Sequence, residues 1–540
     1  MATSTAEANL SSQTYVFPGR PELAVEASRV GVVDDGIDVN NTTLAPYVDM
    51  NGSVDHVDGA APLHGPDSRH ATAVAGVIVA TAPDDAILES HRLAFGTGGS
   101  GLVGALEAQV GVDVSNNSWS FTVRFADDVA NPAYDVIFDP VEAGAREGRG
   151  GLGTVWVFAA GNGRRDGDNT NYHNLQNSEY TIAVGAVDAG GDAADFSTPG
   201  AAMLVSAPGV AVTTTDRPGA AGYASGDTAV VSGTSFAAPA VSGIVARMLG
   251  SNPELGYRDV QEILAYSAVP TDAADAGWAE NGARDWNGGG LTFHHRYGFG
   301  LADANAAERL AESWTAQRSR GDRVIYSDGR AFADPLSIPD GDGPADYASV
   351  TFDVTAAIDV DRVEVALDID HPWRGDLVVR LISPTGGESV LIDRPGKDPA
   401  GAGSGSDLAD IDFTTTSVVH FGEDARGEWE VRIEDGAAGF LGAVAAVDLT
   451  LIGDPLSEDD VFIFTDAFAG LAGDRSTLEG DDTGRDTLNL AAVTDAVSVD
   501  LAAGTATVAG RDLAFTADGA VREVRAGDGA DTLTGGAHGD

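Results

Sequence analysis

SGTSFAAPA, at residues 232–240, is the stretch of sequence that says most about the fold. Ser235 follows a Gly-Thr pair and begins an apolar pattern typical of a helix, which ends at Asn252-Pro253. The N-terminus of a helix directs partial positive charge at its surroundings, so a serine there can do more than cap the helix. The ordinary alternative is that Ser235 is only an N-cap, but that role explains one residue of the nine.

Three stretches further upstream also bring single polar residues to the ends of apolar runs. VGVVDDGID, residues 30–38, is typical of a buried strand that ends at Asp34, where α/β sheets place functional groups. RHATAVAG, residues 69–76, places His70 at the start of a helix of small residues, and VFAAGNG, residues 157–163, is a buried strand followed by Asn162. Taken singly, these residues have ordinary alternatives: a turn acid, a structural histidine and a turn asparagine.

The order Asp34, His70, Ser235, together with the strings around them, resembles the motifs of subtilisin-like serine endopeptidases. The resemblance implies that Ser235 is the nucleophile, that His70 is the general base and acid, and that Asp34 orients the imidazole. It also implies that the amide of Asn162 stabilises the oxyanion of the tetrahedral intermediate. The side chain of Asp35, adjacent to Asp34, is expected to point the other way.

The same resemblance predicts where substrate binds. NNSWS, residues 116–120, is similar to the family's edge strand, which pairs with the substrate backbone; this assigns Ser118, Trp119 and Ser120 to substrate binding. A plain core role is the alternative for Trp119. Ala159, Ala160 and Gly161 are predicted to form the other wall of the primary specificity pocket.

Short Val-rich runs alternate with helical patterns over the first 320 residues, which predicts an α/β fold with a parallel sheet covered on both faces. We expect a lead-in over residues 1–28 and a subtilisin-like catalytic domain over residues 29–320. The clearest strands are expected at residues 30–33, 153–160 and 180–187, and the clearest helices at residues 70–80, 236–250, 257–268 and 301–314.

A second domain, an all-β jelly-roll sandwich, is predicted over residues 321–454. Its period-two strands are expected at residues 363–368, 377–382, 429–433 and 447–452, whereas the Pro-, Gly- and Asp-containing residues 320–344 are typical of a linker or irregular entry. HPWRGDL, LISPTG and GEW, at residues 371–377, 381–386 and 427–429, resemble the P-domain of kexin/furin-like proprotein convertases. We expect these motif residues to be structural.

The chain departs from the convertases at the primary specificity pocket. Convertases cleave after basic pairs because acidic residues line this pocket, but Ser120 to Arg124 replace the expected acidic turn and His173 stands in place of a pocket Asp. Asp127 and Asp128 are the nearby acids that could compensate. The sequence therefore predicts broad specificity rather than cleavage after basic pairs.

The remaining residues, 455–540, are acidic and Gly-rich, and we expect them to be the start of an incomplete β-roll tail. AGDGADTLT, residues 526–534, fits the calcium-binding nonapeptide, and GGAHGD, residues 535–540, begins another unit. Both resemble the RTX tails of bacterial secreted proteases. Calcium is therefore predicted as a structural cofactor, with Asp528 and Asp531 as ligands in the tail and Asp166 and Asp168 in the catalytic domain. Solvated loop acids are the alternative for the latter two.

Composition limits the functional classes. The formal net charge of −52 excludes a default nucleic-acid binder, and the absence of cysteine excludes disulfides and thiolate catalysis. No apolar run approaches a membrane span, and no Sec signal is visible at the start. We therefore expect a secreted, monomeric endopeptidase acting on proteins or peptides. The alternatives are a calcium-dependent adhesin with a retired protease domain and a processing protease dedicated to one partner.

Overall fold

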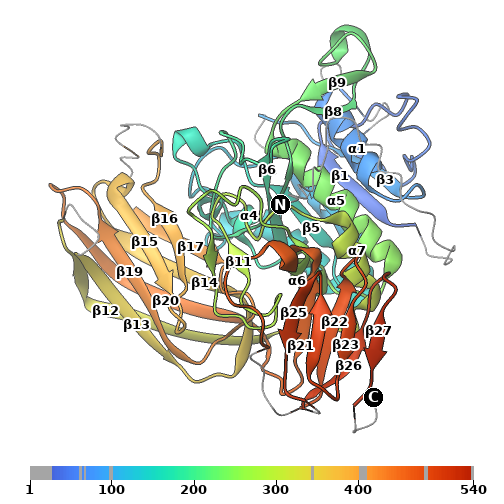
Figure 1. Cartoon of the computed structure of the whole chain (residues 1–540). Helices are drawn as coiled ribbons and strands as arrows, with labels where there is room; N and C mark the ends of the chain where they lie inside the picture. Colours follow the sequence, from blue (N-terminus) through green and yellow to red (C-terminus); the bar gives the residue numbers. More distant parts are fainter. Residues whose placement is uncertain are drawn as a thin grey trace.

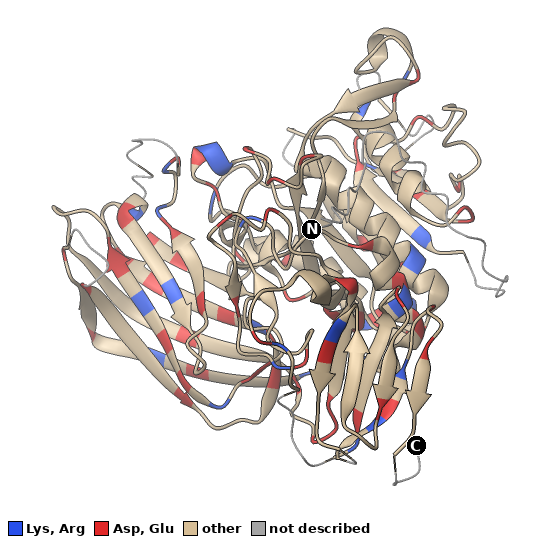
Figure 2. Ribbon diagram, viewed as in Figure 1, with Lys and Arg blue, Asp and Glu red and all other residues tan. Residues whose placement is uncertain are grey.

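The computed structural model describes residues 27–59, 64–65, 68–96, 101–341, 346–399, 405, 410–478, 484–517 and 519–536. Most of the predicted lead-in and the last four residues of GGAHGD lie outside these ranges. Figure 1 shows three bodies packed side by side: an α/β body, a β-sandwich in yellow and orange, and a smaller β module in red. Acidic residues are spread over the strands of both β bodies, as Figure 2 shows, in keeping with the net charge of −52.

A seven-stranded parallel sheet forms the centre of the α/β body, in the order β2-β3-β1-β4-β5-β6-β7. Its strands are β1 Arg29–Asp34, β2 Val54–Asp55, β3 Ile87–Arg92, β4 Val114–Asn117, β5 Val155–Ala159, β6 Thr181–Val187 and β7 Met203–Pro208. Every residue of β5 and β6 is buried, because a parallel sheet is covered on both faces.

Helices cover both faces of this sheet. They are α1 His70–Thr81, α2 Leu102–Ala108, α3 Asp135–Glu147, α4 Asn174–Asn177, α5 Thr234–Ser251, α6 Tyr257–Ser267 and α7 Ala304–Ser313. Val155 and Val157 of β5 share a core with α1 and α5, whereas Trp156 and Phe158 belong to a separate core with α2 and α3. This alternation places the two helix layers on opposite faces.

The predicted strands and helices of the α/β body are present, with shifted ends. The helix predicted from residue 301 begins at Ala304, because Asp303 caps it by accepting the backbone N–H groups of Asn305 and Ala306. Two short antiparallel pairs complete this body: β8 Val212–Thr215 with β9 Thr228–Val231, and β10 Ala279–Glu280 with β11 Thr292–Phe293.

Two antiparallel sheets form the β-sandwich. One has the order β12-β20-β14-β17, with β18 also paired to β14, and the other has the order β13-β19-β15-β16. The strands are β12 Val324–Ile338, β13 Tyr347–Val354, β14 Ile358–Asp370, β15 Leu377–Ile382, β16 Glu388–Asp393, β17 Asp410–Ser417, β18 Glu423–Asp424, β19 Gly427–Asp435 and β20 Gly442–Pro455. The four strands predicted by period-two alternation lie within β14, β15, β19 and β20.

The prediction of a linker over residues 320–344 is wrong for most of that segment. β12 pairs with β20 on both sides of a register shift between Ala331 and Leu336. Pro335 falls inside this shift, where its missing N–H breaks no ladder bond, so a proline-containing segment can still be a strand. The proline that indicated a loop therefore lies in an irregularity of the β12–β20 pairing.

Residues beyond β20 form two further small sheets with their own apolar core. β21 Val461–Thr465, β22 Asp486–Ala492 and β26 Val521–Arg525 are parallel, whereas β25 Arg511–Ala514, β24 Thr505–Val508 and β23 Ser498–Asp500 are antiparallel neighbours. β27 Thr532–Thr534 stacks in parallel on β23, as β26 does on β22. The expectation that this region is the start of a β-roll stays a prediction.

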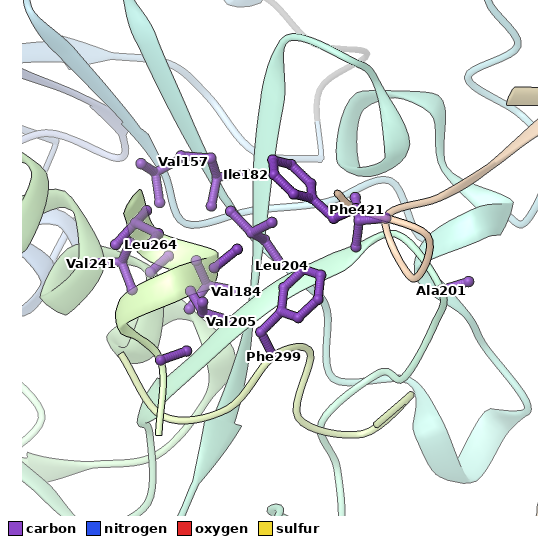
Figure 3. Packing of buried hydrophobic residues seen from close by; sticks show 14 of the residues in the cluster. Val157, Ile182, Val184, Ala201, Leu204, Val205, Val241, Leu264, Phe299 and Phe421 are labelled. Carbon is purple, nitrogen blue, oxygen red and sulfur yellow. The ribbon is translucent and has the colours of Figure 1, made fainter. Parts of the chain in front are cut away.

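Both β bodies contact the α/β body. Figure 3 shows Leu204 of β7 and Phe299 beside Phe421 of the sandwich, and the rings of Phe299 and Phe421 lie 6.1 Å apart between centroids. The module formed by β21 to β27, called the red module after its colour in Figure 1, contacts the α/β body through Arg475. The buried guanidinium of Arg475 donates to the carbonyls of Trp286 and Gly290 in that body. Within the described ranges, no helix has the length and apolar character needed to cross a membrane.

Candidate active site

The Asp34 and His70 side chains meet at the carboxyl end of the parallel sheet. Asp34 is the last residue of β1 and is fully buried, and His70 is the first residue of α1. His70 Nδ1 lies 2.9 and 3.0 Å from the two carboxylate oxygens of Asp34. Since the carboxylate can only accept, Nδ1 carries the proton and Nε2 is left as the basic nitrogen.

The Asp34 carboxylate favours the protonated form of the His70 imidazole. Burial by itself lowers the pKa of His70, but the Asp34 carboxylate outweighs this effect and the net result is a pKa above the usual value. An imidazolium formed during a reaction is thus stabilised by the buried charge beside it. This is the electrostatic arrangement that a general base requires when it takes a proton from a weak acid.

Asp35 has a structural role that the sequence did not reveal. Its carboxylate accepts the backbone N–H groups of Arg69, His70 and Ala71, whereas the imidazole of His70 contacts Asp34. It therefore satisfies the first turn of α1 and fixes the position of His70. Burial, and then the neighbouring Asp34 charge, raise the pKa of Asp35.

Ser235 lies in the first turn of α5 and exchanges hydrogen bonds with Ser118. Its hydroxyl donates to the Ser118 carbonyl at 3.1 Å, and the Ser118 hydroxyl donates to the Ser235 carbonyl at 2.8 Å. Pro239 explains the second bond, because a residue four positions after Ser235 normally donates its N–H to that carbonyl and proline has none. Ser118 supplies the missing donor and joins the expected substrate strand to the serine-bearing helix.

Ser118→Ala removes this donor and leaves the buried Ser235 carbonyl without it. We expect kcat to fall by about tenfold, because one lost hydrogen bond of about 1 kcal/mol also loosens the turn that carries Ser235. Steady-state kinetics on a peptide substrate measures the change. Ser118→Thr keeps a hydroxyl and is the matched control. Equal rates for Ser118→Ala and wild type would show that Ser118 does not position Ser235.

The Asn162 side chain is oriented by Thr234. Asn162 Oδ1 accepts the backbone N–H of Thr234 at 3.0 Å and its hydroxyl at 3.1 Å. Because a backbone N–H can only donate, the atom facing it is the oxygen, and the Nδ2 donor is directed elsewhere. Gly233, with a φ of 150°, precedes Thr234 in a backbone conformation that favours glycine.

A cavity of about 290 Å³ opens at these residues. Its walls are His70, Phe95, Ser118, Trp119, Ser120, Ala159, Gly161, Asn162, Thr234 and Ser235. The structure thus gathers most of the predicted site in one place, except that Asp34 lies behind His70 and Ala160 is buried outside the lining. Phe95, 47% exposed, was missed because nothing in the sequence distinguishes a pocket aromatic from a core one. Among the ten lining residues, His70 is the one ionisable side chain.

Asp127 and Asp168 both contact one buried histidine, His173. His173 is buried, with Nε2 3.1 Å from an Asp168 oxygen and Nδ1 3.4 Å from an Asp127 oxygen. Burial alone lowers the pKa of His173, but the two carboxylates outweigh it and raise the pKa to about 9. His173 thus contacts both acids, and neither Asp127 nor Asp168 lines the cavity.

The four aspartates predicted as calcium ligands have other partners in the structure. Asp168 contacts His173, Asp528 lies 3.0 Å from Nε of Arg309, and Asp531 accepts the backbone N–H of Val497. Asp166 meets Arg124 through its backbone carbonyl. Nowhere in the described ranges do three or more histidine or acidic side chains converge as metal ligands would. Because calcium also binds backbone carbonyls and water, the assignment of these four positions stays a prediction.

Comparison with known proteins extends these observations. Residues 26–300 match the model of the "Subtilase family", and residues 360–451 match that of the "Proprotein convertase P-domain". Endoprotease aex-5 of Caenorhabditis elegans is 30% identical over 79% of this chain and 75% of its own length. Rat proprotein convertase subtilisin/kexin type 6 is 31% identical over 75% of this chain, which spans 44% of that protein.

A solved structure shares the arrangement of the α/β body and the sandwich. The serine protease of Aeromonas sobria superposes with a TM-score of 0.69 over 79% of this chain and 88% of its own, at 24% identity. At this identity the similarity is one of fold.

Proposed function

The chain belongs to the subtilase family, and we propose that it is a serine endopeptidase with Ser235, His70 and Asp34 as its catalytic triad. One observation carries the proposal: the buried Asp34–His70 pair opens onto the same cavity as Ser235 and Asn162. The sandwich and the red module would be the P-domain and a tail, over residues 321–454 and 455–540.

The proposed reaction follows from these positions. Ser235 Oγ turns from the Ser118 carbonyl to His70 Nε2, gives up its proton there and attacks the scissile carbonyl carbon. Asp34 keeps the imidazole in the tautomer that has Nε2 free of hydrogen. His70 then protonates the leaving amine, which leaves an acyl-enzyme, and water that gives its proton to His70 hydrolyses the ester.

Oxyanion stabilisation is assigned to two donors. The backbone N–H of Ser235, in the first turn of α5, and Nδ2 of Asn162 are the groups available at the cavity. The α5 N-terminus adds partial positive charge at the same point. Both donors are fixed before substrate arrives, and fixed donors are what make such sites effective.

Ser118, Trp119 and Ser120 are proposed to pair with the substrate backbone, opposite a wall formed by Ala159 and Gly161. None of the ten cavity residues is a carboxylate, and Asp127 and Asp168 both contact His173. The pocket therefore suits uncharged P1 side chains rather than arginine or lysine.

Peptides that differ only at P1 test this specificity. We expect kcat/KM to be at least about tenfold higher with leucine or phenylalanine than with arginine, because a buried guanidinium without a counter-ion is costly to desolvate. Initial rates on such a matched series measure the ratio. A preference for arginine, or a requirement for two basic residues, would contradict broad specificity and support a convertase-like processing role.

Fluorophosphonate labelling tests the enzyme assignment itself. The probe phosphonylates an activated serine, and we expect intact-mass analysis to show one adduct that peptide mapping locates at Ser235. Prior treatment with phenylmethylsulfonyl fluoride should block it. Absence of labelling in folded protein would favour the non-enzymatic adhesin.

We also propose that the protein is exported and acts as a monomer on proteins or peptides, supported by the acidic composition and the resemblance of its terminal repeat to RTX proteases. Calcium as a structural cofactor remains a prediction from the family resemblance. Cell fractionation, light scattering and thermal melting with calcium or a chelator address these three points separately.

A further inference from the structure

The loop from Phe121 to Asp128 follows Ser120 directly and contacts both large bodies of the molecule. On the side of the α/β body, Arg124 donates to the Asp166 carbonyl at 3.1 Å. Asp127 accepts the backbone N–H of Leu175 at 3.0 Å and contacts His173. The loop that follows Ser120 is therefore fixed to the α/β body by polar contacts at two points.

Phe125, between these two points, holds the loop to the sandwich. Its φ is 59°, an unfavourable value for a phenylalanine, and its N–H donates to the Tyr172 carbonyl at 2.8 Å. Its ring lies 4.6 Å from that of Tyr172 and 5.1 Å, edge to face, from that of Phe413 in β17. Aromatic packing thus holds the residue in a backbone conformation that it would not adopt alone.

Arg374 of the sandwich completes the contact. It lies in the turn between β14 and β15, is 5% exposed, and places its guanidinium carbon 4.5 Å from the centre of the Phe125 ring. One of its terminal nitrogens donates to the Asp410 carbonyl at 3.2 Å, so the group is also held from its own side. A desolvated guanidinium over an aromatic face is a favourable and directional contact.

Ser118, Trp119 and Ser120, which follow β4 and line the cavity, are the part of the site that this contact can influence. Trp119 and Ser120 line the cavity, and Phe125 follows Ser120 by five residues. The Trp119 carbonyl also accepts Nε2 of Gln176, from the segment that carries Tyr172 and His173, at 3.5 Å. A shift of Phe125 would thus reach the substrate wall along the chain, whereas the Asp34–His70 pair is attached to other elements.

We propose that Phe125 is a positioning residue for substrate binding and that Arg374 makes the sandwich part of the specificity apparatus. In this scheme the docked sandwich fixes the loop, and the loop fixes the strand that pairs with substrate. The inference rests on the proposed endopeptidase function and deepens it, because it concerns how that site holds a peptide. It makes the geometry of the pocket depend in part on a residue of another body of the chain.

Arg374→Ala and Phe125→Leu, each in the full chain, test the proposal. We expect each to raise KM for an extended peptide substrate about tenfold with kcat changed less than about twofold, because the substrate wall is misplaced while the triad is not. The second-order rate of fluorophosphonate labelling should stay within about twofold, because the small probe does not use the strand. The KM of Arg374→Lys should lie between those of wild type and Arg374→Ala, since lysine retains a cation over the ring.

Arg330→Ala is the matched control. Arg330 lies 4.7 Å from the Phe352 ring within the sandwich, so its removal deletes a similar contact that does not reach the loop. KM unchanged in Arg374→Ala and Phe125→Leu, at a temperature where both are folded, would overturn the proposal. So would an equal rise in Arg330→Ala. If Arg374→Ala does not fold, Phe125→Leu and Arg374→Lys decide the question. Absence of fluorophosphonate labelling in the wild-type protein would instead refute the endopeptidase function.

Discussion

Replacement of Ser235 by alanine is expected to lower kcat by about 10⁶-fold, the size of effect that follows when a subtilisin-type triad loses its nucleophile. Ser235, one of three serines that line the cavity, lies in the first turn of α5, and removal of its hydroxyl leaves no route to the proposed acyl-enzyme. The cavity and the Asn162 amide remain, so KM should change little. Single-turnover and steady-state assays with a fluorogenic peptide measure the loss.

Ser232→Ala is the control for this variant, because Ser232 is exposed, precedes α5 and uses its hydroxyl to accept the Ala211 N–H. It should retain wild-type kcat and fluorophosphonate labelling. A Ser235→Ala protein that keeps more than about 1% of wild-type kcat, after contaminating protease is excluded by inhibitor titration, would place the nucleophile elsewhere.

Asp34→Asn is expected to lower kcat by about 10⁴-fold while leaving the fold intact. The asparagine amide can donate where the carboxylate could only accept, so it favours the wrong tautomer of His70. Loss of the buried charge also removes the group that holds the pKa of His70 above its usual value. Because His70 must be unprotonated to act as base, the acidic limb of the kcat profile should move to lower pH in the variant.

The pH dependence separates this effect from a general loss of structure. Asp38→Asn serves as control, because Asp38 lies on the same segment but contacts His64 and Arg217. Its acidic limb should match that of wild type. An Asp34→Asn variant with kcat within tenfold of wild type, or an acidic limb that moves to higher pH, would mean that another group orients His70.

The site residues that could be predicted from the sequence are those that lie within short, contiguous motifs. Asp34, His70, Asn162 and Ser235 each stand at the end of a buried strand or the start of a helix, where a local pattern fixes both the element and its polar terminus. The parallel sheet brings these termini to one edge, so correct local assignments were enough to gather the site.

The parts that could not be predicted depend on partners far away in the chain. Ser118 completes a hydrogen bond that Pro239 cannot make, and Phe125 meets Arg374 across two bodies. β12 is a strand because β20 lies beside it, although its own composition is typical of a loop. The surroundings of the predicted calcium ligands depend on distant partners in the same way, since Arg309 contacts Asp528 and His173 contacts Asp168.

Phe299 and Phe421 belong to one apolar core that runs from the α/β body into the sandwich, whereas the red module places Ile463 and Ala492 in that core and packs most of its other buried apolar residues in a core of its own. Cooperativity follows from how such cores are shared. Breaking the sandwich would strip the apolar cover from Phe299 and Leu204, so these two bodies should unfold in one step. The red module contributes only a small part of that core, so we expect it to open first and to leave the packing between the two larger bodies in place. Heat should therefore divide this chain into two cooperative units rather than three.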